Sequence, residues 1–168
     1  MKQLAAPPRG TLSHMADKTS SMITIDAPKS VIMDVIADFA AYPQWASGVK
    51  AAEAESSGDD GRPERVRFSL DAGIVKDRYL LAYRWQGDEE VRWDLAERGT
   101  MVSEMSGAYL LTEESGGGTK VTYELAVGLA VPMPGLLKRR AEKTIIDSAL
   151  KGLRSRAVQV AGESGGGQ

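Results

Sequence analysis

The chain contains no cysteine, and its single histidine, His14, lies close to the start. Without cysteine, disulfides and thiolate metal sites cannot form, and the sequence is compatible with a reducing compartment. The rest of the chain has no histidine to act as a general base, as a metal ligand or as the partner of a nucleophilic serine. These absences exclude hydrolase and zinc-site chemistry, and we expect neither a metal nor a cofactor.

Long hydrophobic runs are also missing. No window approaches the roughly eighteen apolar residues of a membrane span, and the start lacks the apolar run of a signal peptide. The 21 basic and 23 acidic residues leave a formal charge of −2, which argues against a general affinity for nucleic acid or anionic membranes. We expect a cytoplasmic protein with no integral membrane segment and no nucleic-acid partner.

The length of 168 residues suits one domain with a single core. Residues 1–17, which begin with a Pro/Gly/Thr-rich stretch, are expected to be a flexible leader, a misplaced start or a vector remnant. Residues 18–160 form the predicted domain. Residues 161–168, which end in "GESGGGQ", are expected to be a disordered tail.

The predicted domain begins with a strand that is followed by a helix. In "SSMITIDAP", Ile23 and Ile25 share one face of the strand, and Pro28 ends it. Asp26 can cap the helix, in which Pro28 takes an early position that needs no N–H. A second short helical turn, "AAYPQW", is expected to end at Pro43. The apolar face of the first helix is predicted to comprise Val31, Ile32, Val35, Ile36 and Phe39.

From Val49 to Leu129 the hydrophobic period is two, and the interruptions, such as "QGDEE" and "ESGGGT", are short and Gly-rich. This pattern predicts about six consecutive antiparallel strands. The arginines alternate with the apolar residues and are expected outside, although a register shifted by one would bring Arg78 or Arg84 inside. The residues predicted to share the inner face are Val66, Phe68, Leu70, Tyr79, Leu81, Tyr83, Trp85, Val91, Trp93, Leu95, Gly107, Tyr109, Leu111, Val121, Tyr123, Leu125, Val127 and Leu129.

After "VPMPG" the pattern becomes helical for about 25 residues. The other face of this helix is basic and also carries Glu142 and Asp147. We interpret it as a solvated face, with an anionic membrane or a carrier protein as the alternative partners. The apolar stripe is predicted to comprise Leu137, Ala141, Ile145, Ala149, Leu153 and Ala157 at four-residue steps, flanked by Ile146 and Leu150.

This order of elements predicts an α+β, helix-grip fold. A strongly curved antiparallel sheet of about seven strands surrounds a long C-terminal helix, and two short helices follow the first strand. Because one helix cannot fill the concave face of so wide a sheet, we expect a cavity between them.

Three segments, "ITIDAPKSVIMDVIADFAAYPQWASGVK", "GGTKVTYELAV" and "PMPGLLKRRAEKTIIDSALKGLRSRA", resemble the START-like, helix-grip (SRPBCC) superfamily. Over residues 18–158 the chain is similar to its bacterial polyketide cyclase/dehydrase and lipid-transport branch, of the kind common in actinobacteria. The resemblance implies the same fold. Because members range from aromatase/cyclases to ligand carriers, it does not settle the function.

The residues that match the family occupy positions that define its fold. None of them forms a catalytic signature. In the family, the aromatic residue after the proline tends to lie near the cavity mouth, which makes Trp45 a candidate rim residue. As a large aromatic at a helix corner, Trp45 is alternatively a packing anchor. The matched positions are Ala27, Pro28, Asp38, Tyr42, Pro43, Trp45 (with one additional residue of spacing), Gly117, Gly118 and Thr119.

Four of the five tyrosines fall on the predicted inner face. Several buried phenols in an apolar cavity offer donors to a ligand carbonyl, unless they bond to one another, to the backbone or to buried water and only pack. No catalytic residue is identified. The candidate ligand-binding residues are Trp45, Phe68, Tyr79, Tyr83, Trp93, Tyr109, Tyr123, Leu137, Ile145 and Ala149.

Glu104 and Glu124 alternate outward, so the inner face is expected to hold no carboxylate. This favours binding of a hydrophobic small molecule, such as a lipid, a polyketide or another apolar aromatic compound. The alternative is an aromatase/cyclase that folds a poly-β-keto chain and polarises its carbonyls with Tyr or Arg donors. An interaction protein with a filled core is a third hypothesis. A weak dimer or a carrier-protein contact is left open.

Overall fold

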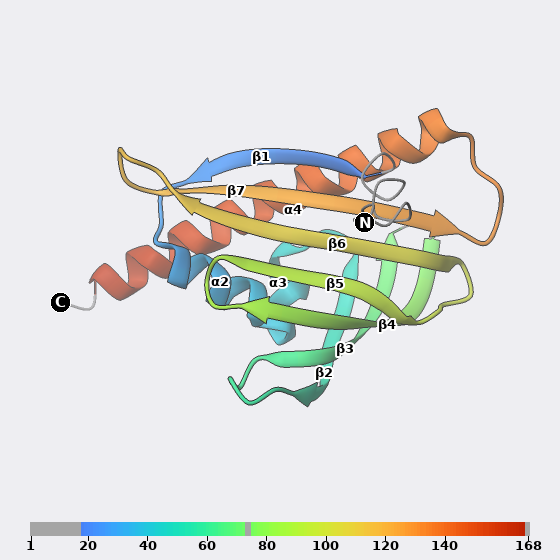
Figure 1. The fold of residues 1–168 in the computed structure, drawn as a ribbon, viewed down its shortest axis with the longest axis horizontal. Helices are drawn as coiled ribbons and strands as arrows, with labels where there is room; N and C mark the ends of the chain where they lie inside the picture. Colours follow the sequence, from blue (N-terminus) through green and yellow to red (C-terminus); the bar gives the residue numbers. More distant parts are fainter. Residues whose placement is uncertain (1–17, 73–74, 167–168) are drawn as a thin grey trace, which may run out of the picture.

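A computed structural model describes residues 18–72 and 75–166 of the chain. The first strand, three short helical elements, six further strands and a long helix follow one another (Figure 1). Their bounds are β1 Thr19–Ile25, α2 Lys29–Ala37, η1 Phe39–Ala41, α3 Tyr42–Trp45, β2 Val49–Ser57, β3 Pro63–Ala72, β4 Val75–Gln86, β5 Glu90–Glu97, β6 Val102–Glu113, β7 Thr119–Leu129 and α4 Gly135–Gly166.

The strands form one seven-stranded antiparallel sheet in the order β1-β7-β6-β5-β4-β3-β2. Strands β2 to β7 pair in chain order, and β1 pairs with β7 at one edge. The sheet curves around α4, which packs against β1 and β7 and also against α2 and α3 (Figure 1). The predicted meander and helix-grip architecture are therefore confirmed. No helix in the described residues is long and apolar enough to cross a membrane.

The turn before β7 is locked to the turn after β1. The Thr119 hydroxyl donates a buried hydrogen bond of 2.8 Å to the carbonyl of Ala27. Gly118 has a φ of +81°, and a Cβ added there would lie 2.9 Å from the carbonyl oxygen of Ile25. Only glycine accommodates both the positive φ and this approach. The Ala-Pro and Gly-Gly-Thr positions thus meet at one corner of the fold.

Two details of the short helices differ from prediction. Pro28, not Asp26, is the N-cap of α2, and no side chain caps this helix. The turn that precedes it is closed by a backbone bond from Ala27 N–H to the carbonyl of Ile25. Pro43 lies in the first turn of α3 instead of ending a helix, because the first turn is where a missing N–H is tolerated.

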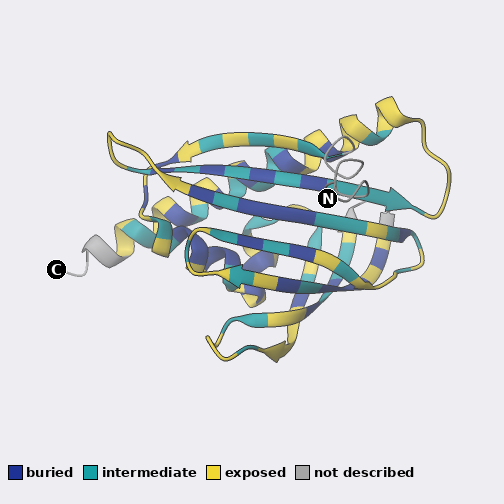
Figure 2. Cartoon of the chain, viewed as in Figure 1, coloured by how far each residue is buried: buried dark blue, intermediate teal, exposed yellow. Residues whose placement is uncertain are grey.

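The two faces of the sheet separate as the alternation predicts (Figure 2). Arg78 and Arg84 are exposed, and Arg84 pairs with Asp94 on the outer face at 2.8 Å. Arg67 likewise reaches two outer carboxylates, at 2.9 Å each. The register therefore keeps these arginines outside, and the shifted alternative is excluded.

The inward face of α4 differs from the predicted stripe. Leu137 and Ile145 are exposed, and Glu142, assigned to the polar face, is buried. A helix has 3.6 residues per turn, so a row of four-residue steps rotates by about 40° at each step and cannot stay on one face. The buried stripe instead follows steps of four, four, three and four residues. It comprises Glu142, Ile146, Leu150, Leu153 and Ala157.

The end of the domain also differs from prediction. Helix α4 continues to Gly166, through most of the segment expected to be a disordered tail. Extension of an existing helix is cheap compared with its nucleation, and residues 161–166 contain no proline to stop it. The predicted leader, with His14, lies outside the described residues.

Candidate functional site

Four tyrosines meet on the concave face of the sheet. Tyr79 and Tyr83 extend from β4, Tyr109 from β6 and Tyr123 from β7, and all four are buried, as predicted. The register places Tyr109 directly opposite Tyr123, and their ring centroids lie 4.5 Å apart. Alternation on neighbouring antiparallel strands therefore gathers residues that are far apart in the sequence. We call Tyr79, Tyr83, Tyr109 and Tyr123 the tyrosine cluster.

The centre of this wall is the indole of Trp93. A Cβ at Gly107, the cross-strand partner of Trp93, would lie 2.4 Å from the Trp93 ring. The missing side chain at Gly107 thus lets the indole lie against β6. From there its ring reaches Tyr83 at 5.4 Å and Tyr109 at 5.6 Å between centroids.

The hydroxyls of the tyrosine cluster have no hydrogen-bond partner in the described part of the chain. The fifth tyrosine, Tyr42, donates to the carbonyl of Ile36 at 2.6 Å. Within residues 18–72 and 75–166, no hydrogen bond is found for the hydroxyls of the tyrosine cluster. These oxygens are not sealed in protein, because the indole nitrogen of Trp45 is the single fully buried side-chain polar atom without a partner among the described residues. Each of the four residues keeps 5 to 7% of its surface exposed, and the two open hollows described below are lined by other residues.

The electrostatics of the cluster keep the phenols neutral. Burial raises the pKa of the hydroxyls of Tyr83, Tyr109 and Tyr123, and the neighbouring phenols raise it further. For Tyr79, burial is again the first cause, and the charge of Asp77 adds to the rise in pKa. At neutral pH each group is thus an O–H donor, able to bind a carbonyl or ether oxygen.

Further aromatic rings extend the site toward α2 and α3. Phe68 stacks on Tyr79 at 5.8 Å, and Phe39 lies 4.9 Å from both Tyr83 and Tyr42. Sequence reasoning did not place Phe39 beside the site, although the helical period already turned it inward.

On α4, the predicted site residues have different outcomes. Ala149 is half-buried and packs against the core. Leu137 and Ile145 are exposed and do not face the aromatic wall, because the inward stripe of α4 lies on a neighbouring row. Thr144, considered as a hydroxyl donor, bonds back to the carbonyl of Arg140 at 3.0 Å.

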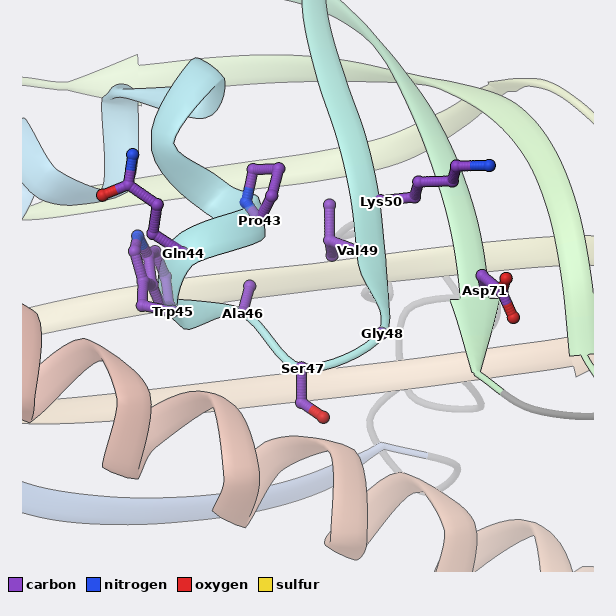
Figure 3. A pocket seen from close by; sticks show the side chains of 9 residues that line it. All are labelled: Pro43, Gln44, Trp45, Ala46, Ser47, Gly48, Val49, Lys50 and Asp71. Atoms are coloured by element: carbon purple, nitrogen blue, oxygen red, sulfur yellow. The ribbon is translucent and has the colours of Figure 1, made fainter.

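An open hollow of about 490 Å³ lies where α3 turns into β2. Figure 3 shows side chains of α3 and the following turn around it, with Lys50 and Asp71 on the side of the strands. A backbone bond of 2.8 Å from Asp71 N–H to the carbonyl of Gly48 joins the two sides. The lining residues are Pro43, Gln44, Trp45, Ala46, Ser47, Gly48, Val49, Lys50 and Asp71.

Trp45 is both a lining residue of this hollow and a contact to α4. Its ring lies 4.7 Å from that of Tyr42, and a Cβ at Gly152 would lie 2.2 Å from the carbonyl oxygen of Trp45. Beside it, Arg156 donates to the side-chain oxygen of Gln44 at 3.0 Å. These contacts favour the packing anchor, and a position of Trp45 at the mouth of a ligand cavity stays a prediction.

Two carboxylates are buried among the described residues, Asp77 and Glu142. Glu142 accepts hydrogen bonds from the hydroxyl of Thr19 at 2.7 Å, from the N–H of Val127 at 2.8 Å and from Lys138 at 3.0 Å. Asp77 accepts from four backbone N–H groups. The expectation of an inner face without carboxylates is therefore wrong, but both groups already accept several hydrogen bonds from the protein.

A curved seven-stranded antiparallel sheet around one long C-terminal helix, with short helices after the first strand, is the START-like, helix-grip fold. The chain belongs to the polyketide cyclase/dehydrase and lipid transport family, whose model matches residues 16–159. Among curated proteins, no sequence match is found.

Solved structures share the fold at low sequence identity. A START superfamily protein from Mycobacterium smegmatis has a TM-score of 0.78 and 20% identity, over 85% of this chain and 98% of that chain. A protein from Thermus thermophilus has a TM-score of 0.70 and 23% identity, over 86% and 99% of the two chains. The Zhui aromatase/cyclase from a Streptomyces species has a TM-score of 0.70 and 13% identity, over 84% and 93%. At these identities the similarity concerns the fold alone.

Proposed function

We propose that the protein binds a hydrophobic small molecule, such as a lipid, a polyketide or another apolar aromatic compound, between the concave face of the sheet and α4. The observation that carries the proposal is the tyrosine cluster, whose hydroxyls lack partners among the described residues. A hydrogen bond from one of these hydroxyls to an accepting ligand oxygen would contribute about 0.5–1.5 kcal/mol. The assigned site comprises Phe68, Tyr79, Tyr83, Trp93, Tyr109 and Tyr123, with Trp45 and Ala149 at its border.

Family membership supports this class of ligand. The family is described by polyketide cyclisation or dehydration and by lipid transport, and both processes handle molecules that combine a hydrocarbon framework with carbonyl or ester oxygens. An apolar wall with a few placed donors is the usual composition of a site for such molecules.

The buried carboxylates favour binding over an aromatase/cyclase reaction. A cyclase needs a proton acceptor beside the substrate. The oxygens of Asp77 and Glu142 are already occupied by four and three hydrogen bonds. Both carboxylates are therefore already engaged by donors of the protein itself.

Native mass spectrometry of the protein purified from its own host tests the proposal. We expect a stoichiometric apolar molecule that is released on denaturation. An empty protein that converts a carrier-tethered polyketide would overturn the binding function in favour of the cyclase.

The tyrosine cluster gives a sharper test with the same co-purified molecule. Tyr83→Phe and Tyr123→Phe should each weaken its affinity about three- to tenfold, since a neutral hydrogen bond contributes about 0.5–1.5 kcal/mol. The melting temperature should change little, because these hydroxyls have no partner among the described residues. Equilibrium dialysis and thermal unfolding measure the two effects.

Tyr42→Phe is the matched control. It removes a hydroxyl that bonds to the carbonyl of Ile36, so it should lower the free energy of unfolding by about 1 kcal/mol and leave affinity unchanged. Unchanged affinity in both cluster variants would remove these phenols from the site.

A further inference from the structure

The connection from β7 to α4 exposes an uncharged apolar segment, residues 131–137, which we call the apolar tip. Its sequence is "VPMPGLL", and every residue in it is exposed. Leu136, in the first turn of α4, is 74% exposed. Seven large hydrophobic side chains are exposed in the described part of the chain, and five of them belong to the apolar tip or the next two turns of α4. These five are Val131, Met133, Leu136, Leu137 and Ile145.

A ring of cations adjoins the apolar tip. Lys138, Arg139, Arg140 and Lys143 follow it directly on α4, and we call these four residues the basic collar. The one acid within residues 131–145 is Glu142, which is buried and bound to Lys138. Lys143 pairs with Asp147 at 2.7 Å.

Among the described residues, the two central arginines of the basic collar have no ion-pair partner. Within the described residues, no carboxylate lies in ion-pair distance of Arg139 or Arg140. Both line an open hollow of about 520 Å³ together with Lys18, Leu136 and Lys143. Cationic and apolar side chains therefore share one continuous surface.

The apolar tip stands at one end of the molecule. In Figure 1 the connection and the first turns of α4 project beyond the sheet, at the end away from α2 and the C-terminus. Figure 2 shows this end as exposed. Because the apolar tip projects, it can contact a partner surface without displacing a strand of the sheet.

We propose that the apolar tip and the basic collar dock this protein on the surface of an anionic lipid bilayer. Apolar side chains at such a surface insert at the boundary between headgroups and acyl chains, and lysines and arginines beside them meet the anionic headgroups. The formal charge of the whole chain is −2, so the attraction is local to the basic collar and orients the molecule with the apolar tip toward the lipid. The proposal rests on this surface alone and stands whether or not the tyrosine cluster binds a ligand.

Co-sedimentation with vesicles tests the docking. The full chain should pellet with vesicles of phosphatidylcholine and phosphatidylglycerol and stay in solution with phosphatidylcholine alone. The double change Leu136→Asp with Leu137→Asp should abolish binding. Neutralising Arg139 and Arg140 to Gln should weaken partitioning about thirtyfold, since each such cation contributes about a fivefold gain near an anionic surface.

The chain offers matched controls and a direct probe of insertion. Met22→Asp and Val158→Asp place the same charge on exposed hydrophobic positions outside the apolar tip, and binding should be unchanged. Because the chain has no cysteine, Leu136→Cys can carry a single environment-sensitive fluorophore. Its emission should shift to the blue on anionic vesicles, whereas the same label at Val158→Cys should not respond.

Three outcomes would overturn the proposal. The first is equal binding of the wild type and the Leu136→Asp, Leu137→Asp variant, and the second is no blue shift at position 136 despite binding. The third is no binding to anionic vesicles together with a tip-dependent complex, either with an acidic protein or with a second copy of this chain. All variants concern exposed side chains, and circular dichroism establishes that they are folded.

Discussion

Asp77 is a buried charge that organises a turn. Its carboxylate accepts hydrogen bonds from the backbone N–H groups of Arg78, Thr100, Met101 and Val102, at 2.7 to 3.0 Å. A Cβ at Gly99 would lie 2.2 Å from a carboxylate oxygen, so this turn passes directly over the charge. One side chain thereby fixes the β5–β6 connection to the start of β4.

Asp77→Asn should lower the free energy of unfolding at neutral pH by about 2–3 kcal/mol. The asparagine side chain has one acceptor oxygen where the carboxylate has two. Its NH₂ group would face backbone N–H groups that are themselves donors. Urea unfolding at neutral pH measures the loss, and Asp71→Asn, at an exposed carboxylate, is the control.

The effect of Asp77 should also depend on pH. Burial acts to raise the pKa of Asp77, but the four backbone N–H groups outweigh it, and the pKa lies below its ordinary value of 3.8. The unfolded chain therefore takes up the proton first, and the stabilisation is lost as the pH falls from this value through the lower folded pKa. The difference between wild type and Asp77→Asn should shrink over that range. A difference independent of pH would contradict the assigned charge.

Glu142 shows what a residue pattern can miss. Its position among lysines and arginines is typical of a solvated face, yet 1% of its surface is exposed. Strand β1 begins at Thr19, opposite Leu125, so the N–H of Val127 lies beyond the pairing of the two strands and takes its acceptor from Glu142. The burial of Glu142 depends on where strand β1 begins. The local hydrophobic period of α4 carries no information about that position.

The contact between α3 and α4 depends on the absence of a side chain. Gly152 lies at the point where α4 meets the carbonyl of Trp45, and the hydrogen bond from Arg156 to Gln44 lies one turn further on. Glycine is ordinarily unfavourable within a helix. Here the close approach explains why alanine is not used.

Gly152→Ala should destabilise the protein by about 1–3 kcal/mol, because the added methyl meets backbone and forces the two helices apart. Gly162→Ala, in the same helix, has no atom within 4 Å of the added Cβ and should stabilise by about 0.5–1 kcal/mol. Thermal unfolding of the two variants measures the opposite signs. Stabilisation by both changes would show that α3 does not press on α4.

The whole molecule buries all five of its tyrosines. Burial is the first cause of a raised pKa in each, so the folded protein holds phenol protons that the unfolded chain releases above its ordinary value of 10.0. Stability should therefore be fully present below that pH and fall steeply above it.

An alkaline titration checks this expectation. The near-ultraviolet absorbance of phenolate should stay flat until the protein unfolds, and all five tyrosines should then ionise in one step with the loss of circular dichroism. Stepwise ionisation of the folded protein near the ordinary value would contradict the raised pKa of the buried phenols.

The alternation of single strands was enough to predict the meander and the inward direction of the cluster. Tyr83, Tyr109 and Tyr123 could be placed because a strand has two faces and one must be covered. The same reasoning erred at Leu137 and Ile145, since a helix presents a continuous set of faces and small errors of period accumulate along it.

Local patterning thus determined the elements, their order and the apolar faces of the strands, because each depends on residues a few positions apart. The rotation of α4, the burial of Glu142 and the exposure of the apolar tip were set only when distant segments packed. Thr19 and Glu142 bond across 123 positions of sequence. Such contacts depend on where an edge strand begins and how far a helix extends past the sheet, which are properties of the assembled fold.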